Sequence, residues 1–317
     1  MNKQPLISVP IFTYNGEKFL EQQLESIYAQ TYKNLEVIAC DDASSDKTVN
    51  ILKKYHNSYG LKYFVHEKNV GVSQNVAKAF SLCTGDFIAP SDQDDVWKPE
   101  KLQLLIDNIG DSSLIYSLST PIDENDNPLD SSFYSREQYI EGHNNLGFLF
   151  ENCVSGHTMM FKKELLPYLD TLPNTVYPDW WIAFVASSYG DISFFDEPLV
   201  YYRRHSSQLT QQSKKQTTTL LSRLHSKEKH KKSDIQKISK RLESFAGLSI
   251  LDLETKRYIS DLYIEFEKFN HLYYNKKLEE LLQSKYELVF AMFATKASKY
   301  IKKLSKGIWY YRLRFYV

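Results

Sequence analysis

The amino-acid sequence predicts an α/β fold, in which a mostly parallel sheet is flanked by helices and followed by a C-terminal α-helical extension. Over the first hundred residues, short apolar runs alternate with amphipathic segments, which is typical of strands joined by crossover helices. The chain has 317 residues, of which 42% are hydrophobic and 25% charged, so it can bury one large core and a second, smaller one.

The expected elements follow from apolar runs and from the residues that interrupt them. The first four predicted strands are residues 6–12, 35–40, 62–65 and 86–90. Later elements are a helix at 100–109, a strand at 114–118, a polar turn at 123–128, a strand entered at 155–161, a helix from Pro178 to Ser187, and strands at 192–195 and 198–202. Pro178 and Asp179 are favourable residues for the first turn of a helix.

Polar side chains follow each of the first four predicted strands. They are Thr13-Tyr14-Asn15, Asp41-Asp42, Asn69 with Gly71, and Asp92 to Asp95. Ligands bind outside the carboxyl ends of the strands in such sheets, so we expect the four clusters to line one crevice. They predict a site for a nucleotide and a metal ion.

The segment 91–97 places three carboxylates within four residues. Such crowding is unfavourable unless a cation neutralises it. A hard divalent ion, held by one or two carboxylates and completed by substrate phosphates and water, fits this pattern. The alternative is a solvated acidic turn that caps the following helix.

Several protein classes are disfavoured by missing motifs. There is no Gly-x-Gly-x-x-Gly after the first strand and no Gly-Lys-Ser phosphate loop, which argues against a dinucleotide dehydrogenase and a P-loop NTPase. The three cysteines lack metal-binding spacing and fit a reducing compartment. Since neither a secretory signal nor a membrane-spanning run is recognisable, we expect a cytoplasmic protein, with peripheral contact at the inner face of the cell membrane as an open possibility.

The charge distribution divides the chain in two. Residues 211–317 contain 23 Lys and Arg against 11 Asp and Glu, whereas residues 1–210 contain 16 against 28. This asymmetry predicts an acidic globular domain at 1–210, which the family resemblance given below would make the catalytic one, and a basic, aromatic-rich helical region at 211–317. The boundary is expected near the polar run 206–219.

The motifs together resemble those of bacterial family 2 glycosyltransferases of GT-A fold, in particular the rhamnosyltransferase-like subgroup of cell-surface glycan enzymes. The resemblance covers residues 6–209 and is carried by residues 8–16, by 41–48 with Ala43 in place of the usual Gly, by 69–75, and by 91–97. Four linked motifs in order are specific, whereas a single Asp-x-Asp is weak. If the family's Gly adopts a positive φ, Ala43 is a strained replacement.

The resemblance implies a role for each matching residue. The nucleotide would be bound by Thr13, Tyr14, Asn15, Asp42, Asn69, Asn75 and Asp92, with Asp42 on the pyrimidine base. Asp94 would be the direct ligand of Mn2+ or Mg2+, with His205 as a further contact to the metal or diphosphate. Asp179 would be the catalytic base, and Trp180, Trp181 and Gly156 would line the acceptor and sugar pocket.

Simpler roles are open for several of these residues. Asp179 can simply cap its helix, and one of Trp180 and Trp181 is expected in the core. Tyr14 can be a packing residue and His205 a surface residue. His157 is expected to be a loop histidine outside the catalytic set, and Asp95 is expected to be structural.

The implied reaction moves one sugar from a UDP- or dTDP-sugar to a hydroxyl of a glycan, a lipid-linked or a glycoprotein acceptor. One base without a covalent nucleophile implies single displacement with inversion. The Gln-x-x-Arg-Trp motif of processive synthases is missing, which favours non-processive transfer. The alternatives are a non-catalytic nucleotide-sugar-binding or assembly protein and, more weakly, a sugar nucleotidyltransferase.

The C-terminal region predicts helices at 242–253, 258–272 and 278–293, followed by a basic and aromatic run at 301–315. Aromatic-rich helices favour burial, so we expect a homo-oligomer interface or packing on the catalytic domain. Contact with an anionic membrane surface is the alternative. No nucleic-acid partner is expected, because no recognition motif accompanies the charge.

Overall fold

A computed structural model describes residues 4–129, 139–170, 172–206 and 220–307, without the side chains of 220–232, 293 and 294. The polar run 207–219 and the terminal run 308–315 lie outside the described residues. The chain divides into two compact units. The first comprises Met1–Ser135, Ile140–His143 and Asn152–Ser207, and the second Arg136–Tyr139, Asn144–Glu151 and Gln208–Val317.

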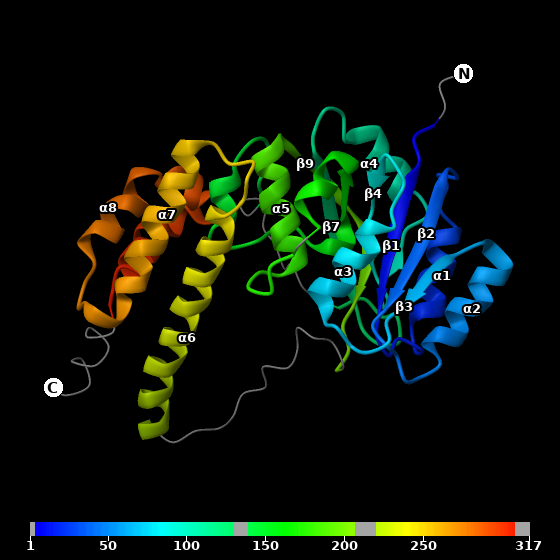
Figure 1. Ribbon diagram of the computed structural model, residues 1–317, viewed down its shortest axis with the longest axis horizontal. Coiled ribbons are helices and arrows are strands. Elements are labelled where there is room, and N and C mark those ends of the chain that lie inside the picture. The colour runs from blue at the N-terminus through cyan, green and yellow to red at the C-terminus, as the bar shows by residue number, and fades with distance from the viewer. Residues whose placement is uncertain (1–3, 130–138, 171, 207–219, 308–317) are drawn as a thin grey trace. The chain divides into compact units, whose positions relative to one another are not determined.

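The first unit is built on a mixed sheet with strand order β3-β2-β1-β4-β8-β7-β9-β6, and with β5 also paired to β1. Strands β1 to β4, β7 and β9 of this sheet are labelled in Figure 1. The strands are β1 (Ile7–Thr13), β2 (Leu35–Asp41), β3 (Lys62–Val65), β4 (Phe87–Ile88), β5 (Ser91–Asp92), β6 (Val96–Trp97), β7 (Leu114–Ile122), β8 (Met159–Lys162) and β9 (Ile192–Arg203). Strands β1 to β5 pair in parallel, whereas β8 is antiparallel to β4 and β7, and β6 is antiparallel to β9. The α/β prediction is confirmed.

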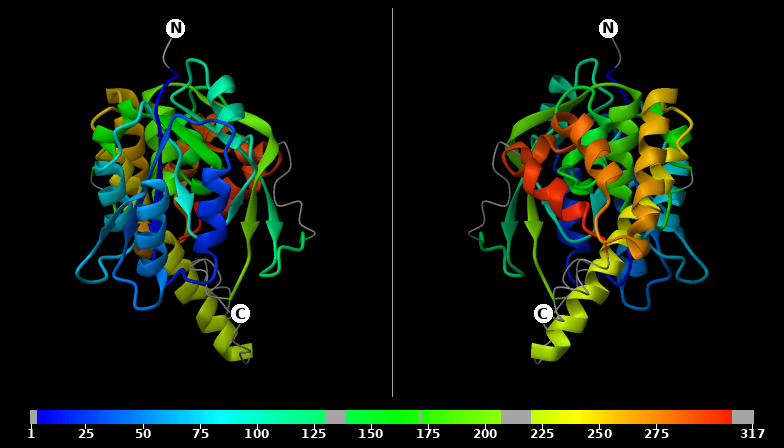
Figure 2. Two further views of the ribbon diagram at one scale, coloured as in Figure 1. Left: turned by 90° about the vertical axis from the view of Figure 1, so that its right-hand side faces the viewer. Right: turned by 90° about the vertical axis from the view of Figure 1, so that its left-hand side faces the viewer.

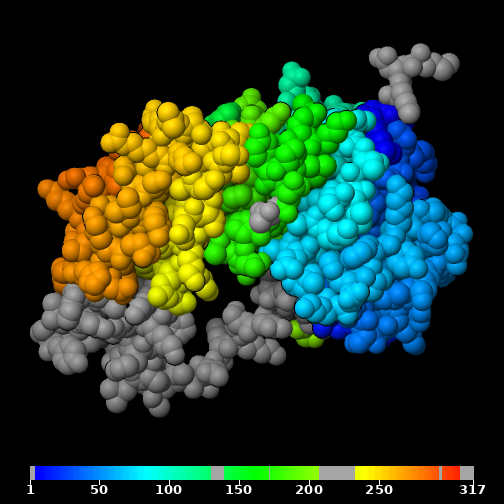
Figure 3. Space-filling view, viewed as in Figure 1, coloured from blue at the N-terminus to red at the C-terminus, as the bar shows by residue number. Residues whose placement is uncertain are grey.

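Helices cover the sheet of the first unit. They are α1 (Leu20–Tyr28), α2 (Thr48–Tyr59), α3 (Val72–Ser81), α4 (Lys101–Asn108) and α5 (Pro178–Tyr189). Helices α3 and α5 lie side by side, in cyan and green in Figure 3. Strand β1 is central because Ile7, Val9 and Ile11 are fully buried, and its neighbours β2 and β4 supply further apolar side chains to the same core.

Two predictions for strands of the first unit are wrong in detail. The predicted strand 86–90 is shorter, and the chain re-enters the sheet as β5, so Asp92 lies within a short strand rather than after one. The two strands predicted at 192–202 form the single strand β9, which runs parallel to β7 (Figure 2). Its pairing with β7 shifts register at Ser117 and Leu118, which pair with Phe195 and Pro198, so the polar residues Asp196 and Glu197 lie in an irregularity within one strand.

The second unit is helical. Its elements are α6 (Leu220–Ala246), α7 (Leu253–Glu267), α8 (Lys276–Ser284), α9 (Tyr286–Val289) and α10 (Ala297–Leu304), with 3-10 turns at Asn145–Phe148, Lys268–His271 and Ala291–Lys296. Buried Leu242, Phe245, Leu262 and Phe266 contribute to its core. Arg241 donates to the carbonyl of Leu149 at 3.1 Å, which attaches the segment 144–151 to this unit.

Two predicted helices in this region are wrong in their limits. The helix expected at 242–253 is interrupted between α6 and α7, where Asp252 accepts a hydrogen bond from Thr255 N and caps α7. The helix expected at 278–293 breaks at Lys285, between α8 and α9. Apolar periodicity continued across both breaks, so it could not locate them. Within the described residues, no helix is both long and apolar enough to cross a membrane.

Candidate active site

The loop after β1 is held against the acidic segment by Gln93. The backbone N–H of Tyr14 donates to Gln93 Oε1 at 2.9 Å, and Gln93 Nε2 donates to the Tyr14 carbonyl at 3.0 Å. A Cβ at Gly16 would lie 2.2 Å from Gln93 Oε1, so a larger residue at this position would displace the Gln93 side chain. The Tyr14 side chain is half exposed, so it is available to a ligand.

The segment after β2 is bonded to the same loop. Asp41 is buried and accepts hydrogen bonds from Thr13 Oγ1 at 2.8 Å and from Ser44 Oγ at 2.6 Å. Asn15 Oδ1 accepts from Ser45 N at 2.9 Å. Thr13 is therefore a buried member of this network, whereas Asn15 lies at its exposed edge.

Ala43 adopts φ +61°, in the left-handed region that favours glycine. Ala43 therefore has the positive φ that makes it a strained replacement for Gly, as expected from the sequence. A non-glycine residue in this region costs about 1–2 kcal/mol. The hydrogen bonds of Asp41 to Ser44 oppose this cost and keep the turn closed.

Asp42 organises the loop before α3. Its two carboxylate oxygens accept from Val70 N at 2.6 Å and Gly71 N at 3.0 Å. Asn69 Nδ2 donates to the Asp42 carbonyl at 3.4 Å. Asn75 is buried on α3 and donates to the Cys40 carbonyl at 3.0 Å. Asp42, Asn69 and Asn75 thus lie together at the ends of β2 and β3.

Asp94 and His205 are in direct contact. His205 Nε2 lies 2.8 Å from Asp94 Oδ2, and the two side chains are 10% and 16% exposed. His205 follows the end of β9, and Phe19 packs beside its ring at 5.0 Å between centroids. The pair is therefore partly exposed, and the Phe19 ring packs against its imidazole.

A second acidic group is more buried. Asp92 and Asp95 each place a carboxylate oxygen 3.7 Å from His157 Nδ1. His157 stacks on Tyr202 with centroids 4.8 Å apart. Asp95 Oδ2 and His157 Nε2 are buried without a hydrogen-bond partner. The ligand atoms of Asp92, Asp95 and His157 all lie within 4.8 Å of one another, so this trio could also hold a metal ion.

Burial and neighbouring charges shift the pKa values of the ionisable groups in and beside this trio. Burial raises the pKa of Asp95 to about 8, with Asp94 and Asp92 adding to the effect and His157 opposing it. Burial alone would lower the pKa of His157, but Asp95 and Asp92 outweigh it and raise that pKa. Lys101 Nζ donates to the His157 carbonyl at 2.7 Å, and burial lowers the pKa of this lysine well below its usual value. The histidine is a charge partner of two carboxylates and not a simple loop residue.

Asp179 begins α5 beside this trio. Burial raises its pKa to about 6; the Trp180 N–H, which donates to Asp179 Oδ1 at 2.7 Å, lowers it, and the nearby charge of Asp92 raises it again. Gly156 faces Asp179, since a Cβ there would lie in van der Waals contact with Asp179 Cβ, at 3.7 Å. A carboxylate with a pKa near 6 is suited to accept a proton at neutral pH.

The two tryptophans differ in environment. Trp181 is buried, and its Nε1 donates to the Tyr168 carbonyl at 3.2 Å. Trp180 is only partly buried. The structure therefore places Trp181 in the core and leaves part of Trp180 accessible beside Asp179.

The donor set fits a divalent cation. A carboxylate and an imidazole in contact, with part of each exposed, can share an ion and leave positions for phosphate oxygens. Asp94 and His205 meet this description better than the trio, because Asp95 is fully buried. Burial and their mutual charges raise the pKa values of both Asp95 and His157, so this pair can hold a proton where the trio would otherwise hold an ion.

Sequence reasoning missed two residues of this region. A lone loop histidine is usually not a ligand, so the sequence gives His157 no catalytic role, although it directly follows Gly156 in a polar entry to β8. Arg203 was not singled out, yet its buried side chain contacts the acidic segment. Its position two residues before His205 was the only available signal.

The family is established by comparison with known proteins. The family model "Glycosyl transferase family 2" matches residues 8–169. An uncharacterized glycosyltransferase of Methanocaldococcus jannaschii is 31% identical over 209 residues, covering 63% of this chain and 71% of that protein. The chain belongs to glycosyltransferase family 2, so the resemblance at the level of the family and the expectation of a glycosyltransferase are confirmed. The rhamnosyltransferase-like subgroup stays a prediction.

Other relatives are matched over a smaller part of their length. Chondroitin synthase of Escherichia coli is 33% identical over 145 residues, which is 44% of this chain and 21% of that enzyme. The chain therefore spans about a fifth of this relative.

Two solved structures are similar in fold. The Staphylococcus aureus TarS fragment 1–349 in complex with UDP-GlcNAc matches with a TM-score of 0.59 at 18% identity, covering 94% of this chain and 89% of that one. The Pyrobaculum calidifontis mannosyltransferase PcManGT, in complex with GDP-Man and Mn2+, matches with a TM-score of 0.55 at 18% identity, covering 94% and 76%. At this identity the similarity shows the fold alone.

Proposed function

We propose that the protein is a metal-dependent, inverting and non-processive glycosyltransferase that moves one sugar from a nucleoside diphosphate to an acceptor hydroxyl. The observation that carries this proposal is the placement of Asp179, with its raised pKa, beside the acidic segment that holds Asp92 and Asp94. One carboxylate is suited to take a proton, while the acidic segment is suited to bind a cation. Family membership supports the reaction class.

In the proposed reaction, Asp179 accepts the proton of the acceptor hydroxyl as its oxygen attacks the anomeric carbon. The bond from that carbon to the diphosphate oxygen breaks in the same step, so the configuration inverts. A metal ion held by Asp94 and His205 would act as a Lewis acid toward the leaving diphosphate. Partly exposed Trp180 is suited to stack on a sugar ring beside Gly156.

The nucleotide would lie over the ends of β1 to β3. Tyr14 and Asn15 offer an exposed ring and an amide, and Asp42 with Asn69 and Asn75 shapes the adjoining loop. Thr13 would act through Asp41. We propose a UDP- or dTDP-sugar as donor, and a glycan, a lipid-linked or a glycoprotein hydroxyl as acceptor. The solved structures of neighbours in complex with UDP-GlcNAc and with GDP-Man support a nucleotide-sugar donor in general.

A screen of donors tests the proposal. Thermal shift with UDP-, dTDP- and GDP-sugars in Mn2+ or Mg2+ identifies the bound nucleotide, and nucleotide release measures turnover. We expect release to depend on metal and to be lost in Asp94→Ala and in Asp179→Ala. Unchanged release in both variants would refute the catalytic assignment. Binding without any release would favour the alternative, a non-catalytic nucleotide-sugar-binding or assembly protein.

For the second unit we propose self-association through the C-terminal helices. Half-exposed Leu288, Tyr273 and Tyr286 are apolar or aromatic side chains of this unit, and such surfaces favour protein contacts. Light scattering after size exclusion tests it, with a monomer as the contrary result. Binding of that monomer to anionic vesicles would favour peripheral membrane contact instead.

A further inference from the structure

Arg203 is among the largest fully buried side chains of the described residues, with 1% of its surface exposed. It ends β9, two residues before His205. Burying a guanidinium is unfavourable unless its donors are paired. Its contacts therefore indicate what the residue holds in place.

One set of contacts reaches the acidic segment. Arg203 Nε donates to the backbone carbonyl of Asp94 at 2.9 Å. The backbone N–H of Arg203 donates to Asp95 Oδ1 at 3.1 Å. A single residue thus connects the peptide that carries Asp94 with the strand that leads to His205.

The other contacts reach the turn after β7. Arg203 Nη1 donates to the Asp123 carbonyl at 3.2 Å and pairs with Asp126 Oδ1 at 2.7 Å. The turn is itself ordered, because Asp123 Oδ1 accepts from the backbone N–H groups of Asn125 and Asn127 at 2.8 and 2.9 Å. The guanidinium therefore rests against a turn that is closed by its own side chains.

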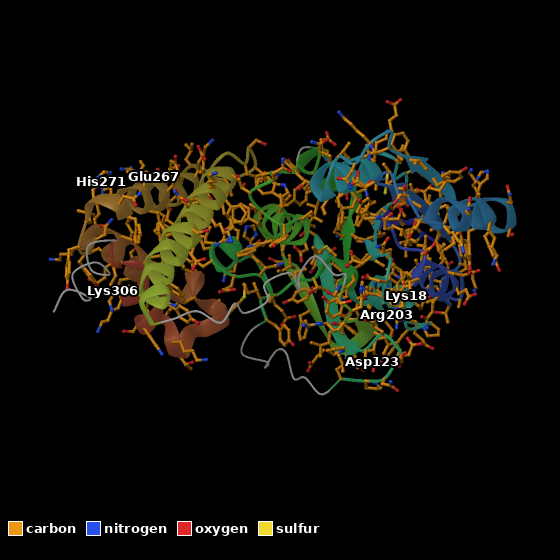
Figure 4. The ribbon with its side chains drawn as sticks, turned by 90° about the horizontal axis from the view of Figure 1, so that it is seen from below. Lys18, Asp123, Arg203, Glu267, His271 and Lys306 are labelled. Atoms are coloured by element: carbon orange, nitrogen blue, oxygen red, sulfur yellow. The ribbon has the colours of Figure 1, made fainter. Side chains whose placement is uncertain are left out.

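Helix α1 and Phe19, the residue before it, also contact the Arg203 side chain. Gln22 Oε1 accepts from Arg203 Nη2 at 2.8 Å, and the Phe19 ring lies 4.6 Å from the guanidinium carbon. Lys18 pairs with Glu124 of the turn. Figure 4 shows Lys18, Arg203 and Asp123 in this corner of the first unit. Since Phe19 also packs on the His205 ring, the same aromatic side chain supports both residues.

We propose that Arg203 is a positioning residue that orients Asp94 and His205 for a divalent cation, and that the turn Asp123–Asn127 sets the orientation of Arg203. This inference rests on the proposed metal site. Arginine is required because its planar fork donates in three directions at once, to Asp94, to the turn and to Gln22. Lysine keeps the charge but cannot make all of these bonds.

Direct Mn2+ binding tests the proposal. The affinity is measured by the electron paramagnetic resonance signal of free Mn2+ with wild type, Arg203→Lys, Asp126→Asn and the control Arg204→Lys. We expect the Mn2+ Kd of Arg203→Lys to rise about 10- to 100-fold, as for other residues that orient metal ligands. Asp126→Asn, which changes a side chain that is 54% exposed, is expected to show a smaller rise, and Arg204→Lys none.

A second readout separates positioning from a merely structural role. If Arg203 orients the ligands, saturating Mn2+ restores most of the nucleotide-release kcat of Arg203→Lys, whereas a general loss of structure is not rescued by metal. If Arg203→Lys does not fold, Asp126→Asn decides by the same two measurements.

Each outcome has a defined meaning. Equal Mn2+ affinity in wild type and in the folded variants overturns the role of Arg203 and leaves the metal site intact. No Mn2+ binding by wild type overturns the metal site itself, and the role of Arg203 with it. A weakened and metal-rescued Arg203→Lys supports both.

Discussion

His205 Nε2 lies 2.8 Å from Asp94 Oδ2, although 111 residues separate them in the chain. Strand β9 brings the histidine to the acidic segment, because Trp97 and Val96 of β6 pair with its Val200 and Tyr201. The contact joins the acidic segment to the end of β9. It also provides the sharpest test of the proposed metal site.

Removing either member of this contact is expected to abolish metal binding. Asp94→Asn keeps the shape but loses the charge, so the Mn2+ Kd should rise more than about 100-fold. His205→Ala should have a comparable effect on affinity. Isothermal titration with Mn2+ measures it, with Asp170→Asn, an exposed acid after β8, as the control. Full affinity in both variants would place the ion elsewhere.

The trio of Asp92, Asp95 and His157 is the alternative location for that ion. Asp95→Asn is nearly isosteric and keeps an oxygen for the Arg203 N–H. If the ion is held by Asp94 and His205, the variant should bind Mn2+ close to wild type. A large loss of affinity in Asp95→Asn, together with normal affinity in His205→Ala, would assign the ion to the trio instead.

The pH dependence of turnover reports on Asp179. Its pKa is raised by burial to about 6, and only the deprotonated form can accept a proton. We therefore expect kcat/KM to fall about tenfold per pH unit below that pKa and to level off above it. Asp179→Asn should remove this limb together with most activity. A wild-type profile that stays flat down to about pH 5 would contradict the role of Asp179 as the base.

Stability should respond to relief of the turn after β2. Ala43 has φ +61°, so Ala43→Gly removes backbone strain but increases the freedom of the unfolded chain. Since the strain is the larger effect, we expect the free energy of unfolding to rise by about 0.5–1 kcal/mol. Urea denaturation measures this change. Ala77→Gly, at a half-buried position inside α3, is the matched control and should lower stability instead.

Substitution of Trp181 is expected to lower stability, whereas substitution of Trp180 is expected to weaken substrate use. Trp181→Ala removes a buried ring and should destabilise the protein by about 3–5 kcal/mol. Trp180→Ala, at a partly exposed position, should keep the thermal midpoint and raise the KM for donor or acceptor. Thermal unfolding and steady-state nucleotide release measure the two effects. The opposite pattern would exchange their roles.

The sequence was sufficient for the fold class and for the family, because both depend on local patterns. Apolar strands, amphipathic helices and polar strand ends can each be recognised from a short segment of sequence. The motifs at Asp41-Asp42 and at Asp92 to Asp95 occur in the order expected for the family. Within the described residues, element limits were less accurate where a pattern crossed a break, as at Asp252 and Lys285. At Asp252 a side-chain cap, and not periodicity, decides where the helix begins.

The contacts between segments that are distant in the sequence could not be predicted in the same way. Nothing local indicates that residues 144–151 join the C-terminal unit, that His157 lies between Asp92 and Asp95, or that Arg203 is buried against Asp94. Charge and pKa depend on distances between distant segments and on exclusion of water. The sequence alone therefore determined which side chains are available for chemistry, whereas the tertiary structure decided which of them meet, which are buried, and which carboxylate has the pKa of a base.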